Sequence, residues 1–498
     1  MTLLNSKSRR VKCRRDLLRP IWLPASDARV SCGWSWENAM NRAGFSEMNT
    51  TIGMVREEES VSEELSRSEL VRRSGEPTRT ILDDADAIAT AEELAVEIAR
   101  DAADRDRNRR LPYGEIKSLS ESGLLGVTIP KRWGGAEVSI TTLGAIKRMM
   151  AAADPNIAQI PKNHFLAIDI MLLNGSDEQK KFLFDEVLKG KLVGRAASER
   201  GEDVLQIKTR LTRSGADLLL NGEKCYTTGA LYCDWIVVGT IDDGGHYIQA
   251  FVPRHAHGVT VIDDWSGLGQ RTTASGTAKF NDVIVDPSHV VSLEDAYVKP
   301  SLAGPVSQYL DACIGAGIAS AAIDEAMLFV NSRARPWADS GVSRACEDPY
   351  IISVVGDLKI RLFAAEASLE RVGRRLDTIF AAVPSEDTVA VASVNVAVVK
   401  VLTTELAILA TNKLFELSGA SATLATYNLD RHWRNARTHT LPEITISTAS
   451  IRDVITTFSH IRRPVHHTSI TRNWTSENDI VHYQCVGIGV GPSNLSVA

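Results

Sequence analysis

A change of texture along the chain is the feature that most constrains its fold. Before Leu192 the sequence is rich in alanine, glutamate and leucine, with apolar residues at helical spacing. From residue 192 to about 291, short β-prone runs are separated by turn residues, a pattern typical of an antiparallel sheet or small barrel. Helical sequence returns after Leu302 and continues to His439. Helices, a β-domain and a second helical region form an uncommon order, which predicts an α+β multidomain protein.

Local signals place individual elements within this order. Pro112 opens one helix and Gly123 ends it, and the alanine-rich stretches after residue 302 suit closely packed helices. We expect helices over 81–106, 112–123, 139–152, 157–173 and 178–188, and strands over 209–212, 218–223, 235–240, 247–252, 259–262 and 278–280. These predict an N-terminal helical domain (81–191), a central antiparallel β-domain (192–292) and a C-terminal four-helix-type bundle (300–441).

The two ends of the chain differ from this body. Residues 1–80 begin with a basic segment and later become highly charged, which predicts a disordered or misassigned lead. The tail, 442–498, ends in Gly487-x-Gly489-x-Gly491 after a β-prone run, as a dinucleotide-binding turn begins. The chain stops within the helix that should follow, so we assign no site there. Our interpretation is a fused, truncated or misjoined reading frame.

Composition excludes several classes of protein. The net charge of −6 over 498 residues argues against a nucleic-acid-binding surface across the whole chain. No run approaches the roughly 18 uninterrupted apolar residues of a membrane span, so we expect no membrane insertion. The seven cysteines are scattered without a CxxC pair, which argues against a disulfide framework or a metal site. This usage fits a reducing, cytoplasmic compartment.

The densest polar segment of the body is 431–441. It holds two histidines, three arginines, an asparagine and a tryptophan. On a helix, Asn435 and His439 are four residues apart and share a face, which could present an amide and an imidazole to one ligand. The alternative is a solvated helix end whose basic side chains complement the helix dipole.

Several segments in sequence order resemble one enzyme superfamily. Residues 123–136 resemble the N-terminal motif of the acyl-CoA dehydrogenase superfamily, and 221–230 resemble its flavin-contacting strand and turn. Four segments are similar to a monooxygenase branch, the sulfur-acquisition oxidoreductases and dibenzothiophene monooxygenases: 163–165, 263–277, 334–342 and 428–441. The resemblance runs from about residue 86 to 441. It implies the acyl-CoA dehydrogenase fold.

The resemblance also bears on the reaction. Many acyl-CoA dehydrogenases carry a glutamate base on the C-terminal bundle, where this chain has Arg437-Thr-His-Thr440 and therefore no carboxylate. A flavin monooxygenase instead needs activated oxygen kept from water and helped by a positioned hydrogen-bond donor near neutral pKa, a task that suits histidine. The family match implies that His164, His439 and Thr228 are catalytic. For His164, the alternative is a satisfied histidine at a helix edge.

By the same resemblance, the flavin lies against the β-domain. Its ring would meet Thr227 and Thr228, with Tyr226 and Trp265 as walls. Ser198 would line the site too, and Asn435 would orient the ligand. Relatives commonly carry asparagine at the position of Arg195, a difference that could alter flavin binding or leave an outward-pointing side chain. The alternative for the whole group is an ordinary sheet edge, since threonine and tyrosine favour strands.

Arginines are the candidates for binding the flavin phosphate. The resemblance implies Arg271 and Arg335, with Arg335 reaching the flavin of a neighbouring subunit. Gly419-Ala-Ser421 replaces the Gly-Gly turn that receives the adenosine diphosphate of FAD in the dehydrogenases. FMN is therefore the predicted cofactor and FAD the alternative.

Together these inferences predict a two-component monooxygenase. The body of the chain shows no complete nicotinamide site, so a separate NAD(P)H:flavin reductase would supply reduced FMN. The enzyme, a homotetramer by resemblance, would use O2 to oxygenate a small organosulfur compound. The alternatives are an acyl-CoA dehydrogenase holding FAD, an amine N-hydroxylase, and a catalytically dead product, because 442–498 do not continue as the family does.

Overall fold

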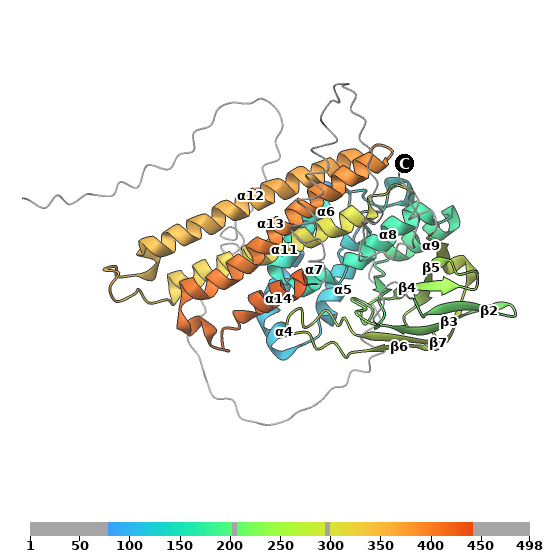
Figure 1. Ribbon diagram of the computed structural model, residues 1–498, viewed down its shortest axis with the longest axis horizontal. Coiled ribbons are helices and arrows are strands. Elements are labelled where there is room, and N and C mark those ends of the chain that lie inside the picture. The colour runs from blue at the N-terminus through green and yellow to red at the C-terminus, as the bar shows by residue number, and fades with distance from the viewer. Residues whose placement is uncertain (1–77, 202–206, 294–298, 442–498) are drawn as a thin grey trace, which may run out of the picture. The chain divides into compact units, whose positions relative to one another are not determined.

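The computed structural model describes residues 78–201, 207–293 and 299–441 (Figure 1). The expectations for the tail, 442–498, and for all but the last residues of the lead lie outside these described residues. Within them, helices precede and follow a sheet, so the predicted α+β fold class is confirmed.

The N-terminal part is helical, as predicted, but two of the expected helices are each broken in two. The segment 81–106 forms α3 (Asp84–Ala99) and α4 (Ala102–Asn108). The segment 157–173 divides at Pro161, which has no N–H to continue a helix, into α7 (Pro155–Gln159) and α8 (Lys162–Asn174). The other helices of this part are α5 (Tyr113–Glu121), α6 (Ile140–Ala153) and α9 (Asp177–Leu188).

The central part is an eight-stranded sheet in the described residues, with the order β6-β7-β3-β2-β4-β5-β8 and β1 paired to β4. Its strands are β1 (Val193–Ala196), β2 (Arg210–Ser214), β3 (Asp217–Lys224), β4 (Trp235–Asp242), β5 (Tyr247–Pro253), β6 (Val259–Ile262), β7 (Thr277–Val285) and β8 (Val290–Ser292). The prediction of a wholly antiparallel sheet was wrong in one respect, because β4 pairs in parallel with both β1 and β2. β1 and β8 were also missed, since each is too short to show an alternating pattern.

The C-terminal part is a bundle of α11 (Ala303–Ser332), α12 (Pro349–Phe380), α13 (Glu386–Ser418) and the shorter α14 (Asp430–Thr440). α11 lies inside it and contacts α13, α12 and also α6 (Figure 1). By length and composition α11 and α13 could each cross a membrane, but 67% of the most apolar stretch of α11 is buried by the rest of the protein. α11 is thus the core helix of the bundle.

Contacts along the helices fix their directions. Asp324 pairs with Lys359 at 2.6 Å, and the Tyr309 hydroxyl donates to the Leu369 carbonyl at 3.2 Å, so α11 and α12 are antiparallel. A short turn after α12 reverses the chain again, which makes α11 and α13 parallel; Lys400 of α13 accordingly donates to Gln308 near the start of α11. The segments that follow α11 and α13 therefore lie at the same end of the bundle.

Candidate functional site

The polar segment singled out in the sequence forms α14, which lies antiparallel to α11. Near the end of α11, Glu325 accepts hydrogen bonds from His432 at 2.7 Å and from Arg431. Near the start of α11, the Asp311 carbonyl lies 2.9 Å from Nε2 of His439. These two anchors hold α14 along its whole length, so the direction of His439 is fixed by the bundle.

The hydrogen bond to Asp311 defines the tautomer of His439. A carbonyl oxygen can only accept, so Nε2 carries the hydrogen and Nδ1 carries the lone pair in the neutral ring. Nδ1 has no hydrogen-bond partner among the described residues. Burial lowers the pKa of His439 below its ordinary value of 6.5, more than the nearby Asp311 raises it. Near pH 7 the free nitrogen of His439 is therefore a hydrogen-bond acceptor and not the donor expected from the sequence, because burial keeps the ring neutral; it becomes a donor only on protonation.

A buried ionic cluster that the sequence analysis missed surrounds His439. The Asp311 carboxylate accepts a hydrogen bond from Lys162 at 2.5 Å and lies 3.9 Å from Lys400. Burial alone raises the pKa of Asp311, but Lys162 and Lys400 bring it below its ordinary value. This carboxylate is therefore held as an anion by lysines rather than free to act as a base. Asp311, an aspartate within the apolar first half of α11, was the signal that could have revealed it.

His164, the other predicted catalytic histidine, is fully buried and engaged at both ring nitrogens. Nε2 donates to the Leu125 carbonyl at 2.9 Å, and Nδ1 accepts from the Val193 N–H at 3.1 Å. Burial lowers the pKa of His164 to about 4, so the ring is neutral and its tautomer is fixed. The geometry is that of a satisfied histidine that joins α8 to β1. A catalytic role for His164 stays a prediction, and no free nitrogen supports it.

The predicted flavin wall forms one face of the β-domain. Tyr226 is 65% exposed and meets the Trp265 ring edge-on, with 6.3 Å between ring centroids. Tyr226 also adopts a φ of 54°, a left-handed conformation that is uncommon outside glycine and often marks functional positions. Ser198 is exposed. It lies beside these residues because its backbone forms an isolated antiparallel β-bridge with Cys225, which precedes Tyr226. The structure thus brings Ser198, Tyr226 and Trp265 to a common, open surface.

The two predicted threonines differ in what their hydroxyls contact. Thr227 is fully buried and donates to the Gly276 carbonyl at 2.9 Å. Thr228 is partly exposed, and its hydroxyl lies 2.6 Å from that of Ser275, which in turn lies 2.9 Å from that of Thr273. Of the two threonines, only Thr228 places its hydroxyl at the surface, where it is the last of three hydrogen-bonded hydroxyls. Ser275, inside the segment that resembles the monooxygenases, was not singled out from the sequence.

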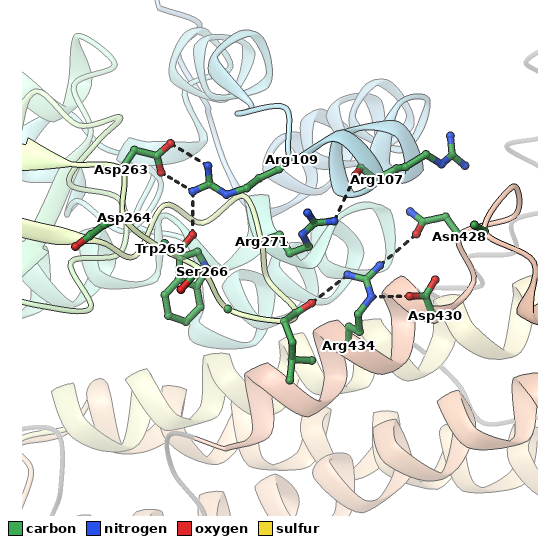
Figure 2. Close-up of a pocket in the computed structure, with 13 residues that line it drawn as sticks. Arg107, Arg109, Asp263, Asp264, Trp265, Ser266, Arg271, Asn428, Asp430 and Arg434 are labelled. Atoms are coloured by element: carbon green, nitrogen blue, oxygen red, sulfur yellow. Dashed lines mark hydrogen bonds and ion pairs between the residues drawn. The ribbon is translucent and has the colours of Figure 1, made fainter.

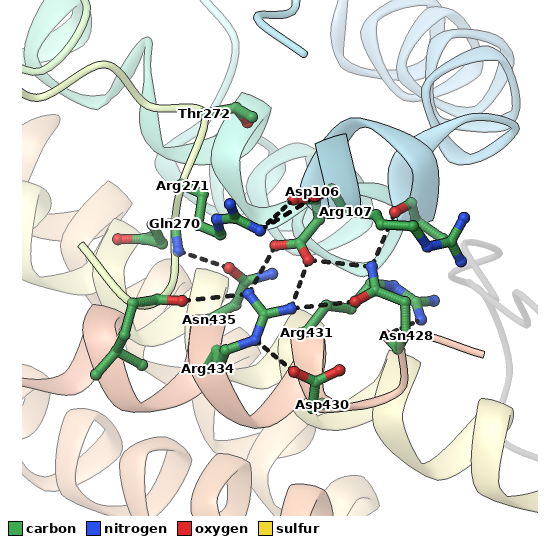
Figure 3. A network of polar contacts seen from close by, with 12 residues as sticks. Asp106, Arg107, Gln270, Arg271, Thr272, Asn428, Asp430, Arg431, Arg434 and Asn435 are labelled. Carbon is green, nitrogen blue, oxygen red and sulfur yellow. Dashed lines mark hydrogen bonds and ion pairs between the residues drawn. The ribbon is translucent and has the colours of Figure 1, made fainter. Parts of the chain in front are cut away.

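Asn435 and Arg271 belong to a polar network that joins all three parts of the chain (Figure 3). Asn435 accepts from the Gln270 N–H at 2.6 Å, which ties α14 to the loop between β6 and β7. Arg271 donates to the Asp106 carbonyl at 2.8 Å, at the end of α4. The Asp106 carboxylate, almost fully buried, binds Arg434 through both oxygens. The carboxamide oxygen of Asn435 therefore positions a loop, and α4, the loop and α14 hold one another in place.

A cleft of about 740 Å³ adjoins this network (Figure 2). Trp265, Arg271, Arg107 and Arg109 are among its lining residues. Arg109 is neutralised by Asp263, to which it donates two hydrogen bonds. Within the described residues, Arg107 and Arg271 donate only to main-chain carbonyls. The cleft thus brings the predicted ring contact Trp265 and the predicted phosphate contact Arg271 to one place.

Arg335 and Gly419 lie elsewhere. Arg335 is exposed in the loop after α11 and has no ion pair within the described ranges, and Gly419 follows α13 with a φ of 75°. From Asp311, the residue beside His439, α11 extends about 30 Å towards this loop. Neither residue has a hydrogen bond or ion pair to the β-domain wall within the described residues, and a role of Arg335 at the flavin of a neighbouring subunit stays a prediction.

Comparison with known proteins agrees with this architecture. Models of the acyl-CoA dehydrogenase N-terminal, middle and C-terminal domains match residues 85–191, 196–283 and 310–443. Dibenzothiophene monooxygenase of Rhodococcus erythropolis is 34% identical over 375 residues, which cover 72% of this chain and 90% of that protein. The chain belongs to the acyl-CoA dehydrogenase family.

Two solved structures of this acyl-CoA dehydrogenase family are similar to the whole body of the chain. FMN-bound TdsC from Paenibacillus sp. A11-2 is 30% identical with a TM-score of 0.71, covering 76% of this chain and 98% of that one. The methanesulfinate monooxygenase MsuC from Pseudomonas fluorescens is 28% identical with a TM-score of 0.68 and the same coverage. The similarity places the chain in the flavin-dependent monooxygenase branch of the family.

The residues present fit a flavin. Buried side-chain groups without a hydrogen-bond partner in the described part of the chain include Gln270 Nε2, Thr272 Oγ1 and Thr438 Oγ1, the last beside His439. Buried polar groups are rarely left unpaired unless a ligand or water completes them. The carbonyl oxygens and ring nitrogens of a flavin accept such bonds, and the exposed Tyr226 ring and the half-buried Trp265 ring offer flat apolar contact.

Proposed function

We propose that this chain is a two-component, FMN-dependent monooxygenase that oxygenates a small organosulfur compound. The observation that carries the proposal is His439, which is fixed in one tautomer with Nδ1 unpaired in the described residues, while the only carboxylate beside it is paired with lysines. By the family resemblance, many acyl-CoA dehydrogenases carry a glutamate base at this end of the bundle, and this chain has no free carboxylate there among the described residues. The relatives that share the fold include monooxygenases of dibenzothiophene and methanesulfinate.

Different residues of the chain have different roles in such a reaction. Reduced FMN supplies two electrons to O2, so that one oxygen atom goes to sulfur and the other leaves as water. Tyr226 and Trp265 flank the ring, and the Thr228 hydroxyl bonds its polar edge. Nδ1 of His439 accepts a proton or hydrogen bond from the reacting oxygen species. Asn435 acts indirectly, since it holds the loop that carries Gln270 and Arg271.

The proposal includes a neighbouring subunit. Ile352, Ile360 and Phe363 form an exposed apolar stripe on one face of α12, with Ile360 71% and Phe363 75% exposed. Contiguous exposed apolar side chains mark association surfaces, and an oligomer of this chain would bury them. It would also let Arg335 bind the flavin phosphate of a neighbouring subunit. We propose a homotetramer in the cytoplasm, served by a separate NAD(P)H:flavin reductase.

Purified chain should be mixed with FMN, NADH, a flavin reductase and either methanesulfinate or dibenzothiophene under 18O-labelled O2. We expect an oxygenated sulfur product, identified by mass spectrometry, with one atom from 18O-labelled O2. A control without the chain corrects for peroxide released by the reductase. Reoxidation of FMN with no labelled product from either compound would contradict the proposal, and tight FAD binding with turnover of an acyl-CoA would replace it by a dehydrogenase.

A further inference from the structure

Arg195 on β1 carries a charge that the described residues do not satisfy. Its Nε is shielded from solvent and has no hydrogen-bond partner, and no carboxylate pairs with its guanidinium there. A guanidinium stays protonated at any physiological pH, so burial cannot neutralise it. Only Nε is shielded in this way, because the Arg195 side chain as a whole is half-buried; a shielded donor of a charged group is destabilising unless a ligand or water accepts its hydrogen bond.

The surroundings of Arg195 add positive charge rather than remove it. Lys224 is fully buried nearby; its burial, and to a smaller extent the charge of Arg195, lower the pKa of Lys224. The one carboxylate close to Lys224 is Glu199, whose oxygens already accept from Lys224 at 2.7 Å, from Thr209 and from Lys208. Glu199 thus compensates Lys224 and leaves Arg195 as an excess cation.

Arg195 lies in β1 between Val193, which contacts α8, and Ser198, which pairs with the segment of Tyr226. Two residues before Arg195, the Val193 N–H donates to His164 on α8. Three residues after it, Ser198 bridges Cys225, which directly precedes Tyr226 and the partly exposed Thr228. An anion held by Arg195 would therefore lie beside the proposed flavin wall.

We propose that Arg195 binds the oxyanion of the substrate and selects an alkanesulfinate, an anionic organosulfur compound; this rests on the proposed function. The planar fork of a guanidinium donates two parallel hydrogen bonds, which matches the two oxygens of a sulfinate. A neutral heterocycle such as dibenzothiophene offers no such acceptor pair. Resemblance gives relatives commonly a neutral asparagine here, so the arginine adds a positive charge to this position.

The reaction balances with the components already named. An alkanesulfinate, R–SO2⁻, reacts with reduced FMN and O2 to give a sulfonate, R–SO3⁻, with oxidised FMN and water. The sulfur lone pair forms the new S–O bond and sulfur loses two electrons. The O–O bond breaks, and the second oxygen leaves as water with the two hydrogens of reduced FMN. The charge on the substrate is unchanged, so Arg195 holds substrate and product alike.

The test is calorimetric titration of methanesulfinate into the full chain loaded with oxidised FMN, which needs no turnover. We expect Arg195→Asn to weaken methanesulfinate binding about 10- to 100-fold, as the loss of a charge-assisted pair implies. Arg213→Asn, at an exposed arginine on β2 of the same sheet, is the matched control and should bind as the wild type does. The FMN dissociation constant, followed by flavin fluorescence, should be the same for all three.

A second measurement needs no variant. Dimethyl sulfone has nearly the shape of methanesulfinate but no charge, and we expect the wild type to bind it at least about tenfold more weakly, a 1.4 kcal/mol difference. Equal binding of the two compounds, unchanged sulfinate binding by Arg195→Asn, or a loss of FMN affinity in that variant would each overturn the inference. Arg195-dependent sulfinate binding with no labelled product from any sulfur compound would instead sustain this anion site and contradict the monooxygenase.

Discussion

Two adjacent threonines show, at the scale of single residues, how a structure separates similar side chains. Both lie where the family places the flavin ring, and only the resemblance singles out Thr228 as catalytic. In the fold the Thr227 hydroxyl is committed to the Gly276 carbonyl, whereas that of Thr228 is partly exposed and contacts only another hydroxyl, Ser275. The Thr228 hydroxyl is free to reorient towards a ligand, and the Thr227 hydroxyl is not.

Replacing each threonine by valine tests this difference, because valine keeps the shape and removes the hydroxyl. We expect Thr228→Val to weaken FMN binding by about 3- to 10-fold, the value of one neutral hydrogen bond. Thr227→Val should leave FMN affinity unchanged and lower thermal stability, since the Gly276 carbonyl loses the hydroxyl donor and keeps only the Thr227 N–H. Flavin fluorescence titration measures the affinity. The reverse pattern would assign the ring contact to Thr227.

His439 gives the second prediction at this scale. We expect His439→Ala to retain FMN but to lower labelled product formation by about 10²- to 10⁴-fold, the range typical of a general acid or base. His257→Ala, at an exposed histidine of the β-domain, is the control. Because the pKa of His439 is lowered from 6.5, the ring stays neutral as the pH falls through 6.5. In the wild type, the acid limb of kcat should therefore lie below pH 6.5; a limb above that pH would exclude the neutral acceptor.

At the scale of elements, the register of α14 depends on an ionic lock far from His439. Burial alone raises the pKa of Glu325, but the hydrogen bond and charge of His432, followed by the charge of Arg431, lower it to about 2. The lock is therefore complete above the ordinary pKa of 4.5 and is lost as the pH falls towards about 2.

We expect Glu325→Gln to speed hydrogen exchange of the α14 amides about tenfold or more at pH 7, because it leaves Arg431 and His432 without their carboxylate. The difference from the wild type should shrink as the pH falls from 4.5 towards 2. Glu370→Gln, which breaks an exposed pair with Arg374 on α12, is the matched control and should change little. Equal exchange in α14 of wild type and Glu325→Gln at pH 7 would show that packing alone holds the helix.

The elements themselves were largely predictable, and the exceptions have physical reasons. Apolar periodicity located the long helices, and turn residues located most strands, because both patterns are local in the sequence. Pro161 also predicts a helix break, but the apolar periodicity around it favours one continuous helix. β1 was not readable, since its four residues become a strand only by pairing with β4, about forty residues later.

At the scale of the whole molecule, the candidate site depends on contacts between distant segments. Asp106 of the N-terminal part binds Arg434 of α14, and Asn428 binds Asp106, so the C-terminal helix is docked by residues more than three hundred positions away. Resemblance could identify Asn435 and Arg271 as site residues. It could not show that they position a loop and the end of a helix. The ionic partners of His439 were equally hidden, because Lys162 and Asp311 meet only in the fold.

The distance between Arg335 and the rest of the site leads to the last prediction. If Arg335 binds the flavin of a neighbouring subunit, Arg335→Ala and His439→Ala should each be inactive, for different reasons. In a mixed dimer, one site combines the intact His439 of one subunit with the intact Arg335 of the other. Coexpression in equal amounts should therefore restore activity at about a quarter of all sites, because half of the dimers are mixed and each has one intact site.

Separately purified variants that are combined only after assembly should stay inactive, which is the control for the coexpression. If Arg335 served its own subunit, no mixture could contain an intact site and coexpression would restore nothing. A monomeric chain with full activity would likewise contradict a shared site. Tagging the two variants differently and purifying them in tandem isolates the mixed species before the 18O assay. Half of the sites in this species should be active. This outcome depends only on which subunit supplies the arginine.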